Sequence, residues 1–148
     1  MTIAMVNTFH YRRGGDATCA LETTAALRAR GHRVVSFAME HPENEPSAWA
    51  DRFAARVDWR GGKRAALRGL VRGAWNRDAA RRFGALLDQE RPRVVHVHHL
   101  HHHLSPSVVF EARRRGLPVL WTTHDYELLC PAGTLYDGQA PCTRCVDG

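Results

Sequence analysis

The chain has 148 residues, 44% of them hydrophobic and 24% charged, which is enough for one ordinary core and too little for two full domains. Its glycines and prolines are scattered, and no run is apolar for the ~18 residues that a membrane span needs. An apolar run follows the first Met without the segments of a signal peptide, so we expect a cytoplasmic protein.

The charge balance is basic, with 21 Lys and Arg against 15 Asp and Glu and a net charge of +6. In a small domain such an excess favours a partner with phosphates or an anionic surface, although a basic surface without a partner explains it equally well. We expect no nucleic acid as a partner, because the aromatic platforms and groove-reading motifs of such proteins are missing.

The first part of the chain has the pattern of a strand, a helix and a second strand. Residues 2–7 are typical of a buried parallel strand, and a loop with two glycines follows it up to Asp16. The next helix ends at Gly31, and residues 34–38 form the second strand. A short edge strand is expected at 56–59.

The second part continues this alternation. Apolar residues at helical spacing predict one long helix over 63–90, and a strand follows at 94–97. Ser105 and Pro106 predict the start of another helix, and the last strand is expected at 119–122. The sequence therefore predicts an α/β, Rossmann-like domain: an open, mostly parallel sheet with helices on both faces and a ligand crevice at the carboxyl ends of its strands.

Two glycines, Gly14 and Gly15, stand directly after the first strand and before a helix. Glycines here let the backbone approach a ligand, and the N-terminus of the helix attracts phosphate. The alternative is that the pair serves only the turn. Asp16 complicates the phosphate interpretation, because a carboxylate makes a good N-cap but repels phosphate.

Six of the ten histidines fall within residues 96–103. Strand alternation places His96 and His98 on one face of the sheet, so His98 is a candidate to face a ligand. Zinc binding is a second interpretation, but it needs three or four ligands in tetrahedral geometry. Residues 101–103 precede a helix and are also compatible with a solvated loop.

His124 and Asp125 follow the last predicted strand, at the mouth of the expected crevice. A neutral histidine here suits proton transfer or a hydrogen bond to a sugar hydroxyl, and a structural histidine is the alternative. Adjacent residues of a strand point to opposite faces, so the spacing does not make Asp125 the partner that orients the ring.

Three of the four cysteines, Cys130, Cys142 and Cys145, lie near the end of the sequence. The two-residue gap between the last two is the spacing of a structural zinc site. One interpretation is a zinc ion whose fourth ligand follows Gly148, and the other is a set of reduced thiols.

Arginines at positions 64, 68 and 72 recur once per helical turn beside apolar residues. This pattern suits peripheral contact with an anionic membrane, and a solvated basic face is the alternative.

The order of these segments resembles the N-terminal domain of GT-B glycosyltransferases of family 4. The resemblance covers essentially the whole chain. It rests on Gly14-Gly15, Arg30-Gly31-His32-Arg33-Val34, Val94-Val95-His96-Val97-His98, Leu104-Ser105-Pro106-Ser107, and Pro118 through His124-Asp125-Tyr126, followed by Cys130-Pro131 and Asp137-Gly138.

The resemblance implies a retaining transferase that moves a sugar, of the hexosyl type, from a nucleotide-sugar to a glycan, lipid or metabolite acceptor, with no cofactor needed for the chemistry. Gly14 and Gly15 would then lie against the donor diphosphate, and His124 would reach the donor sugar as the catalytic residue. His98, Asp125 and Tyr126 would contact the acceptor or the sugar.

The resemblance also implies a second, nucleotide-sugar-binding domain, so we expect residues 1–148 to be an incomplete acceptor-side domain that is inactive by itself. The parent enzyme would act in the cytoplasm, with peripheral contact at the inner membrane face as an option. The alternative from another class is a zinc-stabilised binding module without transferase activity.

Overall fold

A computed structural model describes residues 1–57, 62–100 and 103–146, with the side chains of 63–68 left aside. The strands are β1 (Thr2–Val6), β2 (Arg33–Phe37), β3 (Val94–Val97) and β4 (Val119–Trp121). The helices are α1 (Gly15–Ala29), a short 3-10 turn η1 (Ala50–Arg52), α2 (Gly62–Ala74), α3 (Arg77–Glu90) and α4 (Ser107–Arg114).

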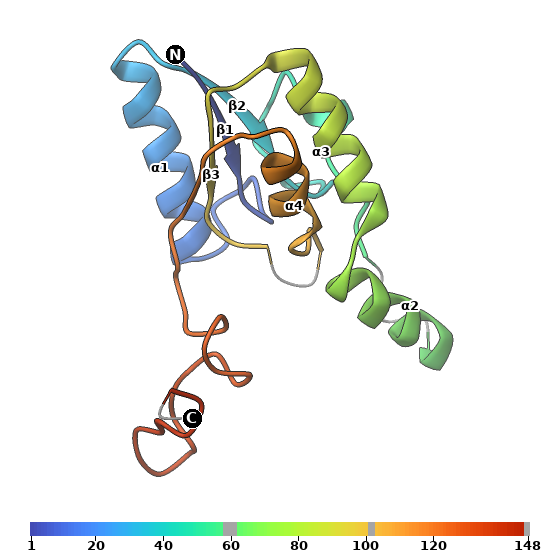
Figure 1. Ribbon diagram of the computed structural model, residues 1–148, viewed down its shortest axis with the longest axis vertical. Coiled ribbons are helices and arrows are strands. Elements are labelled where there is room, and N and C mark those ends of the chain that lie inside the picture. The colour runs from blue at the N-terminus through green and yellow to red at the C-terminus, as the bar shows by residue number, and fades with distance from the viewer. Residues whose placement is uncertain (58–61, 101–102, 147–148) are drawn as a thin grey trace.

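The four strands form one parallel sheet in the order β2-β1-β3-β4. The chain begins at β1 near the centre, moves outward to β2 through α1, and then returns to the other side of β1 with β3 and β4 (Figure 1). This order places a topological switch between β1 and β3, where ligands of such sheets bind. The structure confirms the α/β, Rossmann-like fold that the sequence predicts.

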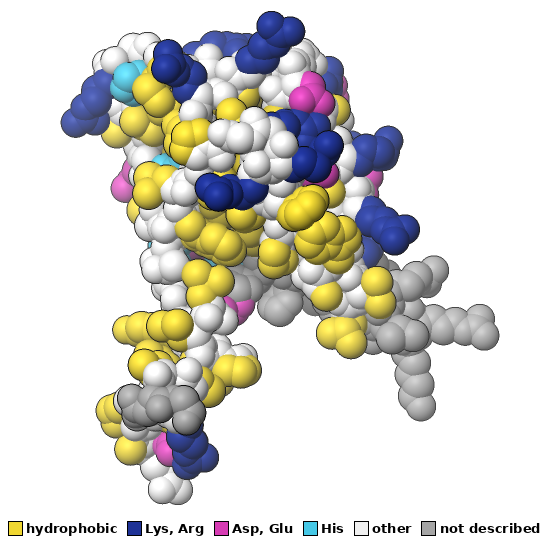
Figure 2. Space-filling view, in the orientation of Figure 1, with side chains coloured by type: hydrophobic (Ala, Val, Ile, Leu, Met, Phe, Trp, Pro, Cys, Tyr) yellow, Lys and Arg dark blue, Asp and Glu magenta, His cyan; other side chains and the backbone are white. Residues whose placement is uncertain are grey.

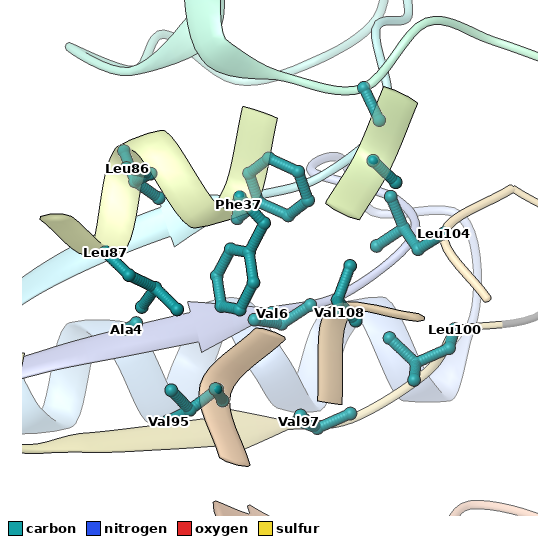
Figure 3. Packing of buried hydrophobic residues seen from close by; sticks show 14 of the residues in the cluster. Ala4, Val6, Phe37, Leu86, Leu87, Val95, Val97, Leu100, Leu104 and Val108 are labelled. Carbon is teal, nitrogen blue, oxygen red and sulfur yellow. The ribbon is translucent and has the colours of Figure 1, made fainter. Parts of the chain in front are cut away.

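The sheet lies between two layers of helices (Figure 1), α1 on one face and α3 with α4 on the other. Inward-facing side chains of the strands, such as Val6, Phe37 and Val97, cluster with Val108 of α4 (Figure 3). Phe83 of α3 belongs to the same buried cluster. Each of these side chains is at most 1% exposed. Burial of a large aliphatic or aromatic side chain contributes about 1.5–3 kcal/mol, so this layer stabilises the fold substantially.

The prediction of one helix over 63–90 is wrong, because the chain breaks into α2 and α3 at Asn76. The Asn76 side chain accepts hydrogen bonds from the backbone N–H groups of Asp78 and Ala79, both at 3.1 Å. The backbone N–H of Asn76 donates to Oγ of Ser105, at 2.8 Å, and not to a carbonyl one turn back in the chain. A buried N-cap thus starts a new helix within a continuous apolar pattern.

The described part of the predicted edge strand, residues 56–57, is not a strand, and residues 58–59 lie outside the described part of the chain. The only described pairing nearby is an isolated bridge between Met39 and Ala54. The backbone N–H groups of Ala55 and Val57 donate to the side chains of Asp78 and His103, so they do not extend a ladder.

The predicted start of the last helix is correct to within a residue. Pro106 has helical dihedral angles, and α4 is counted from Ser107. The N–H of Ser107 donates to Oγ of Ser105, at 3.3 Å, as expected of a capping serine.

Two segments extend away from the α/β body (Figure 1): α2, and the residues that follow β4. Figure 2 shows hydrophobic side chains on the described end of α2 and along the C-terminal segment, whereas arginines gather over the body. Among the described residues, no helix combines the length and apolar character needed to cross a bilayer.

Candidate functional site

A pocket of about 430 Å³ opens at the carboxyl edge of the sheet, between the ends of β3 and β4 and the last turn of α2. Aliphatic and aromatic side chains form much of its wall, and its histidines and Asp125 come from the residues that follow β3 and β4. The lining residues are Leu70, Gly73, Ala74, His98, His99, Leu100, Ser105, Pro106, Trp121, Thr123, His124, Asp125, Glu127 and Leu128. Mostly apolar walls with a few convergent polar groups are typical of small-molecule sites.

His98 and His124 form the polar centre of this pocket. Nδ1 of His98 lies 2.9 Å from Nε2 of His124, within hydrogen-bond distance, and the rings stack with centroids 5.1 Å apart. The indole N–H of Trp121 donates to the backbone carbonyl of His98, at 3.1 Å. The ends of two neighbouring strands therefore fix both rings in one arrangement.

His98 is 2% exposed, whereas His124 is solvent-exposed. Burial, together with the neighbouring His96 and His124 rings, lowers the pKa of His98 to about 4, although the nearby carboxylate of Asp16 acts in the opposite direction. His98 is therefore neutral at pH 7 and able both to donate and to accept one hydrogen bond. It holds His124 without adding charge beside it.

His96 lies on the same face of β3, with its ring centroid 4.4 Å from that of His98. Its Nε2 is 2.8 Å from Oγ1 of Thr122. Burial, followed by the influence of His124, lowers the pKa of His96. The prediction from strand alternation that His96 and His98 lie on one face of the sheet is thus confirmed.

His99 lies between two carboxylates at the edge of the pocket. Its Nδ1 is 3.9 Å from Asp16, and its Nε2 is 3.8 Å from Asp125. Asp125 thus faces His99, while the ring of His124 is held by His98. Sequence reasoning considered His99 only as one of the clustered histidines and gave it no separate role. β3 ends at Val97, so strand alternation does not orient His99.

Gly14 and Gly15 stand where the first loop meets α1. Gly14 is the N-cap, with extended φ and ψ of −161° and −174°, and α1 begins at Gly15. Asp16 therefore lies within the first turn and is not the N-cap that the sequence suggested. Neither Gly14 nor Gly15 has a positive φ angle. A Cβ atom added at Gly15 would have no neighbouring atom within 4 Å. Backbone conformation thus does not demand the second glycine, and the space above it is open to a ligand.

Tyr126 lies apart from the histidine pocket. With Tyr136 and Cys142 it lines a shallower pocket of about 380 Å³ in the C-terminal segment. Its backbone N–H donates to the carbonyl of Gly133, and its carbonyl accepts from the N–H of Cys130. The structure therefore brings His98, His124 and Asp125 together and places Tyr126 with the cysteine-bearing turns.

Those turns draw Cys130 and Cys142 toward one residue, Leu135. The backbone N–H groups of Leu135 and Ala132 donate to the Cys130 sulfur and lower the pKa of its thiol, against the opposing effect of burial. The carbonyl of Leu135 accepts from the N–H of Cys142, at 2.7 Å. In the described part of the chain, however, Cys130, Cys142 and Cys145 do not form a group with three ligand atoms in close reach.

A different group of side chains does bring three possible metal-ligand atoms close together. The sulfur of Cys19 and one ring nitrogen each from His98 and His124 lie within 4.8 Å of one another. Sequence reasoning gave Cys19 no role. The available signal was its spacing of three from Asp16, which places both side chains on one face of the helix behind the glycine loop.

Two of the sequence interpretations concern residues outside the described part of the chain. These are His101 and His102 within the histidine cluster, and the side chains of Arg64 and Arg68 in the proposed membrane face.

Comparison with known proteins supplies the family. A model described as the glycosyl transferase 4-like domain matches residues 14–146, which is most of the chain. The matched region contains the glycine loop, His98, His124 and the cysteine-bearing turns. A search of curated proteins returned no match. The match confirms the resemblance inferred from the sequence, and the chain belongs to the glycosyl transferase 4-like family.

Proposed function

We propose that the chain is the acceptor-side domain of a retaining glycosyltransferase that uses a nucleotide-sugar donor, with His124 at the reacting centre. The observation that carries this proposal is the His98–His124 pair, which stands at the carboxyl edge of a parallel sheet in an open, largely apolar pocket. Family membership supports sugar transfer in general. The mechanism, the donor and the acceptor are our assignments.

His124 is suited to hydrogen-bond a hydroxyl of the donor sugar. Its ring is exposed to the pocket, and its Nε2 is engaged with the neutral His98, which leaves Nδ1 to face another partner. Because the pair is held by two strands, the ring is preorganised and does not have to be ordered when the sugar binds. A polar group held in this way stabilises charge that develops on the sugar.

The donor diphosphate is assigned to the loop at Gly14 and Gly15. Open space above Gly15 lets a phosphate reach the first turn of α1, where backbone N–H groups and the helix dipole favour an anion. Asp16 opposes this in the first turn, but its carboxylate is directed toward His99. The remaining positive charge for the donor would come from a second, nucleotide-binding domain facing this edge of the sheet.

The pocket walls favour an acceptor with an apolar part. Among the candidate acceptors, which are a glycan, a lipid and a metabolite, Leu70, Leu100 and Trp121 best suit a lipid-linked one. Leu70, which lines the pocket, and its neighbour Val71 in α2 are 66% and 60% exposed. We therefore also propose peripheral contact of α2 with the inner face of an anionic membrane.

The proposal is tested with the whole enzyme of which we propose this chain to be a part. It is incubated with a panel of labelled nucleotide-sugars, UDP-glucose and GDP-mannose among them, and with membrane lipid extract. We expect transfer to a lipid-linked product, and nuclear magnetic resonance of the new linkage should show the anomeric configuration of the donor. Inversion of that configuration would refute the retaining mechanism, and hydrolysis without transfer would refute the transferase.

A further inference from the structure

We propose that Cys19, His98 and His124 form a zinc site at the mouth of the pocket. The three residues offer one sulfur and two nitrogens within 4.8 Å of one another. Thiolate and imidazole together are the ligands that Zn²⁺ prefers in proteins.

The distances suit a single ion. With Zn–N of about 2.0–2.1 Å and Zn–S of about 2.3 Å, two ligand atoms of one tetrahedral zinc lie roughly 3.3–3.8 Å apart. The two nitrogens of the histidine pair are 2.9 Å apart, and no pair within the group exceeds 4.8 Å. These values bracket the required spacing, so small side-chain rotations bring the three atoms to coordination distance.

Three separate elements hold the ligands. Cys19 lies in the second turn of α1, His98 follows β3, and His124 follows β4. His98 is only 2% exposed. Its Nε2 atom is buried and has no hydrogen-bond partner among the described residues. A buried polar atom without a partner costs free energy, so the ring of His98 is not fully satisfied by its contact with His124.

Three protein ligands leave a fourth tetrahedral position to water. Such an open set is typical of zinc sites that exchange ligands, whereas structural sites are closed by four protein ligands. Cys19 and His124 are accessible to solvent, which provides the route of entry. The site is thus built for reversible occupancy.

Occupancy has one consequence that rests on the proposed function. Zinc bound at Nε2 of His124 would fix the ring proton on Nδ1, the atom that we assign to the donor sugar, so occupancy would leave that atom able only to donate a hydrogen bond. The metal site itself does not depend on that assignment, and metal binding is measured without any assay of transfer.

The test uses Co²⁺ as a spectroscopic probe and Zn²⁺ as its competitor. The chain carries Cys142→Ser and Cys145→Ser, which removes two of the three C-terminal thiols and leaves the site intact. We expect one Co²⁺ per chain, with a tetrahedral d–d spectrum and the near-ultraviolet charge-transfer band of a single thiolate. Added Zn²⁺ should displace the cobalt.

Replacing Cys19 by Ser in this background should abolish the charge-transfer band and weaken metal binding at least ~10-fold, since even the loss of an outer-sphere partner commonly costs that much. Cys19 is exposed, and circular dichroism checks that the fold persists. Should that variant fail to fold, His124→Ala, also at an exposed position, should weaken cobalt binding at least ~10-fold while a thiolate band remains at saturation. A band that survives Cys19→Ser, an unchanged cobalt affinity in His124→Ala, or a background chain that binds no cobalt overturns the site.

Discussion

Nδ1 of His98 and Nε2 of His124 lie 2.9 Å apart, although 26 positions of the chain separate the two residues. β3 and β4 are parallel neighbours, with Val97 paired to Trp121, so residues just beyond their ends meet at the same edge. His98 is buried and neutral, whereas His124 is exposed. One ring is thus a buried support, and the other is open to the pocket.

This relationship predicts the effect of removing His124. In the whole enzyme, His124→Ala should lower kcat at least ~100-fold, the scale expected when a positioned polar group at a reacting centre is lost. Steady-state kinetics measure the effect, and His32→Ala, in the turn after α1 at the opposite edge of the sheet, is the matched control. Near-normal kcat in a folded His124 variant would refute the catalytic role.

The open space above Gly15 predicts a defect in donor binding. Gly15→Val adds a branched side chain where a phosphate would approach, and it meets no protein atom within 4 Å of its Cβ. We expect unchanged thermal stability within a few degrees and a donor Kd raised at least ~10-fold, because loss of close approach removes about 1.4 kcal/mol or more of a charge-assisted contact. Calorimetric titration with the donor measures this, and an unchanged Kd would contradict a phosphate-facing loop.

Asp78 predicts a pH dependence of stability. Burial raises the pKa of this carboxyl, but hydrogen bonds from the Ala55 N–H and from the Arg82 and Arg81 guanidinium groups outweigh it, so the pKa lies below its ordinary value. A lowered pKa in the folded state means that the stabilisation is complete above the unfolded pKa of about 3.9 and is lost as the pH falls through the folded value.

Asp78→Asn should therefore lower the free energy of unfolding by about 1–2 kcal/mol at pH 7 and by much less at pH 3. Urea unfolding at the two pH values measures the difference. Asp51→Asn is the control, since Asp51 forms an exposed ion pair with Arg52, of a kind that contributes little. An equal loss at both pH values would show that the carboxylate charge is not the cause.

The proposed membrane face of α2 predicts binding to anionic vesicles. Replacing Arg64, Arg68 and Arg72 by Gln should weaken binding by about 1 kcal/mol for each arginine near the surface, and added salt should have the same effect. Vesicle sedimentation measures binding. The control is a triple replacement of Arg30, Arg93 and Arg113 by Gln, which changes the net charge equally; an equal loss in that variant would point to net charge alone.

The C-terminal cysteines predict a second, structural zinc ion in the whole enzyme, held by Cys130, Cys142, Cys145 and a ligand that follows Gly148. The N–H groups directed at the Cys130 sulfur favour its thiolate, and the shared contact with Leu135 keeps Cys142 near it. We expect Cys142→Ser to remove this zinc and to lower Tm, because a closed site contributes to folding. Elemental analysis and calorimetry measure both. A metal-free enzyme whose variant melts at the wild-type temperature would identify the cysteines as ordinary thiols.

The sequence by itself determined the fold class and the location of the site. The apolar runs at 2–7, 34–38, 94–97 and 119–122 appear as β1 to β4 within a residue or two, because strand and helix periods are local properties. Parallel strands align their carboxyl ends, so the order of the elements along the chain already places the glycine loop, His98 and His124 on one edge of the sheet.

Only the tertiary structure decided which side chains touch. The break at Asn76 depends on Ser105, 29 positions away, which accepts a hydrogen bond from the N–H group that a continuous helix would have used internally.

The contacts of the site also depend on how distant elements pack. Packing pairs His124 with His98, brings Cys19 close to both rings, and separates Tyr126 from the pocket. Periodicity along the chain carries no information on such contacts, because they are set by the distances between elements and not by spacing within one.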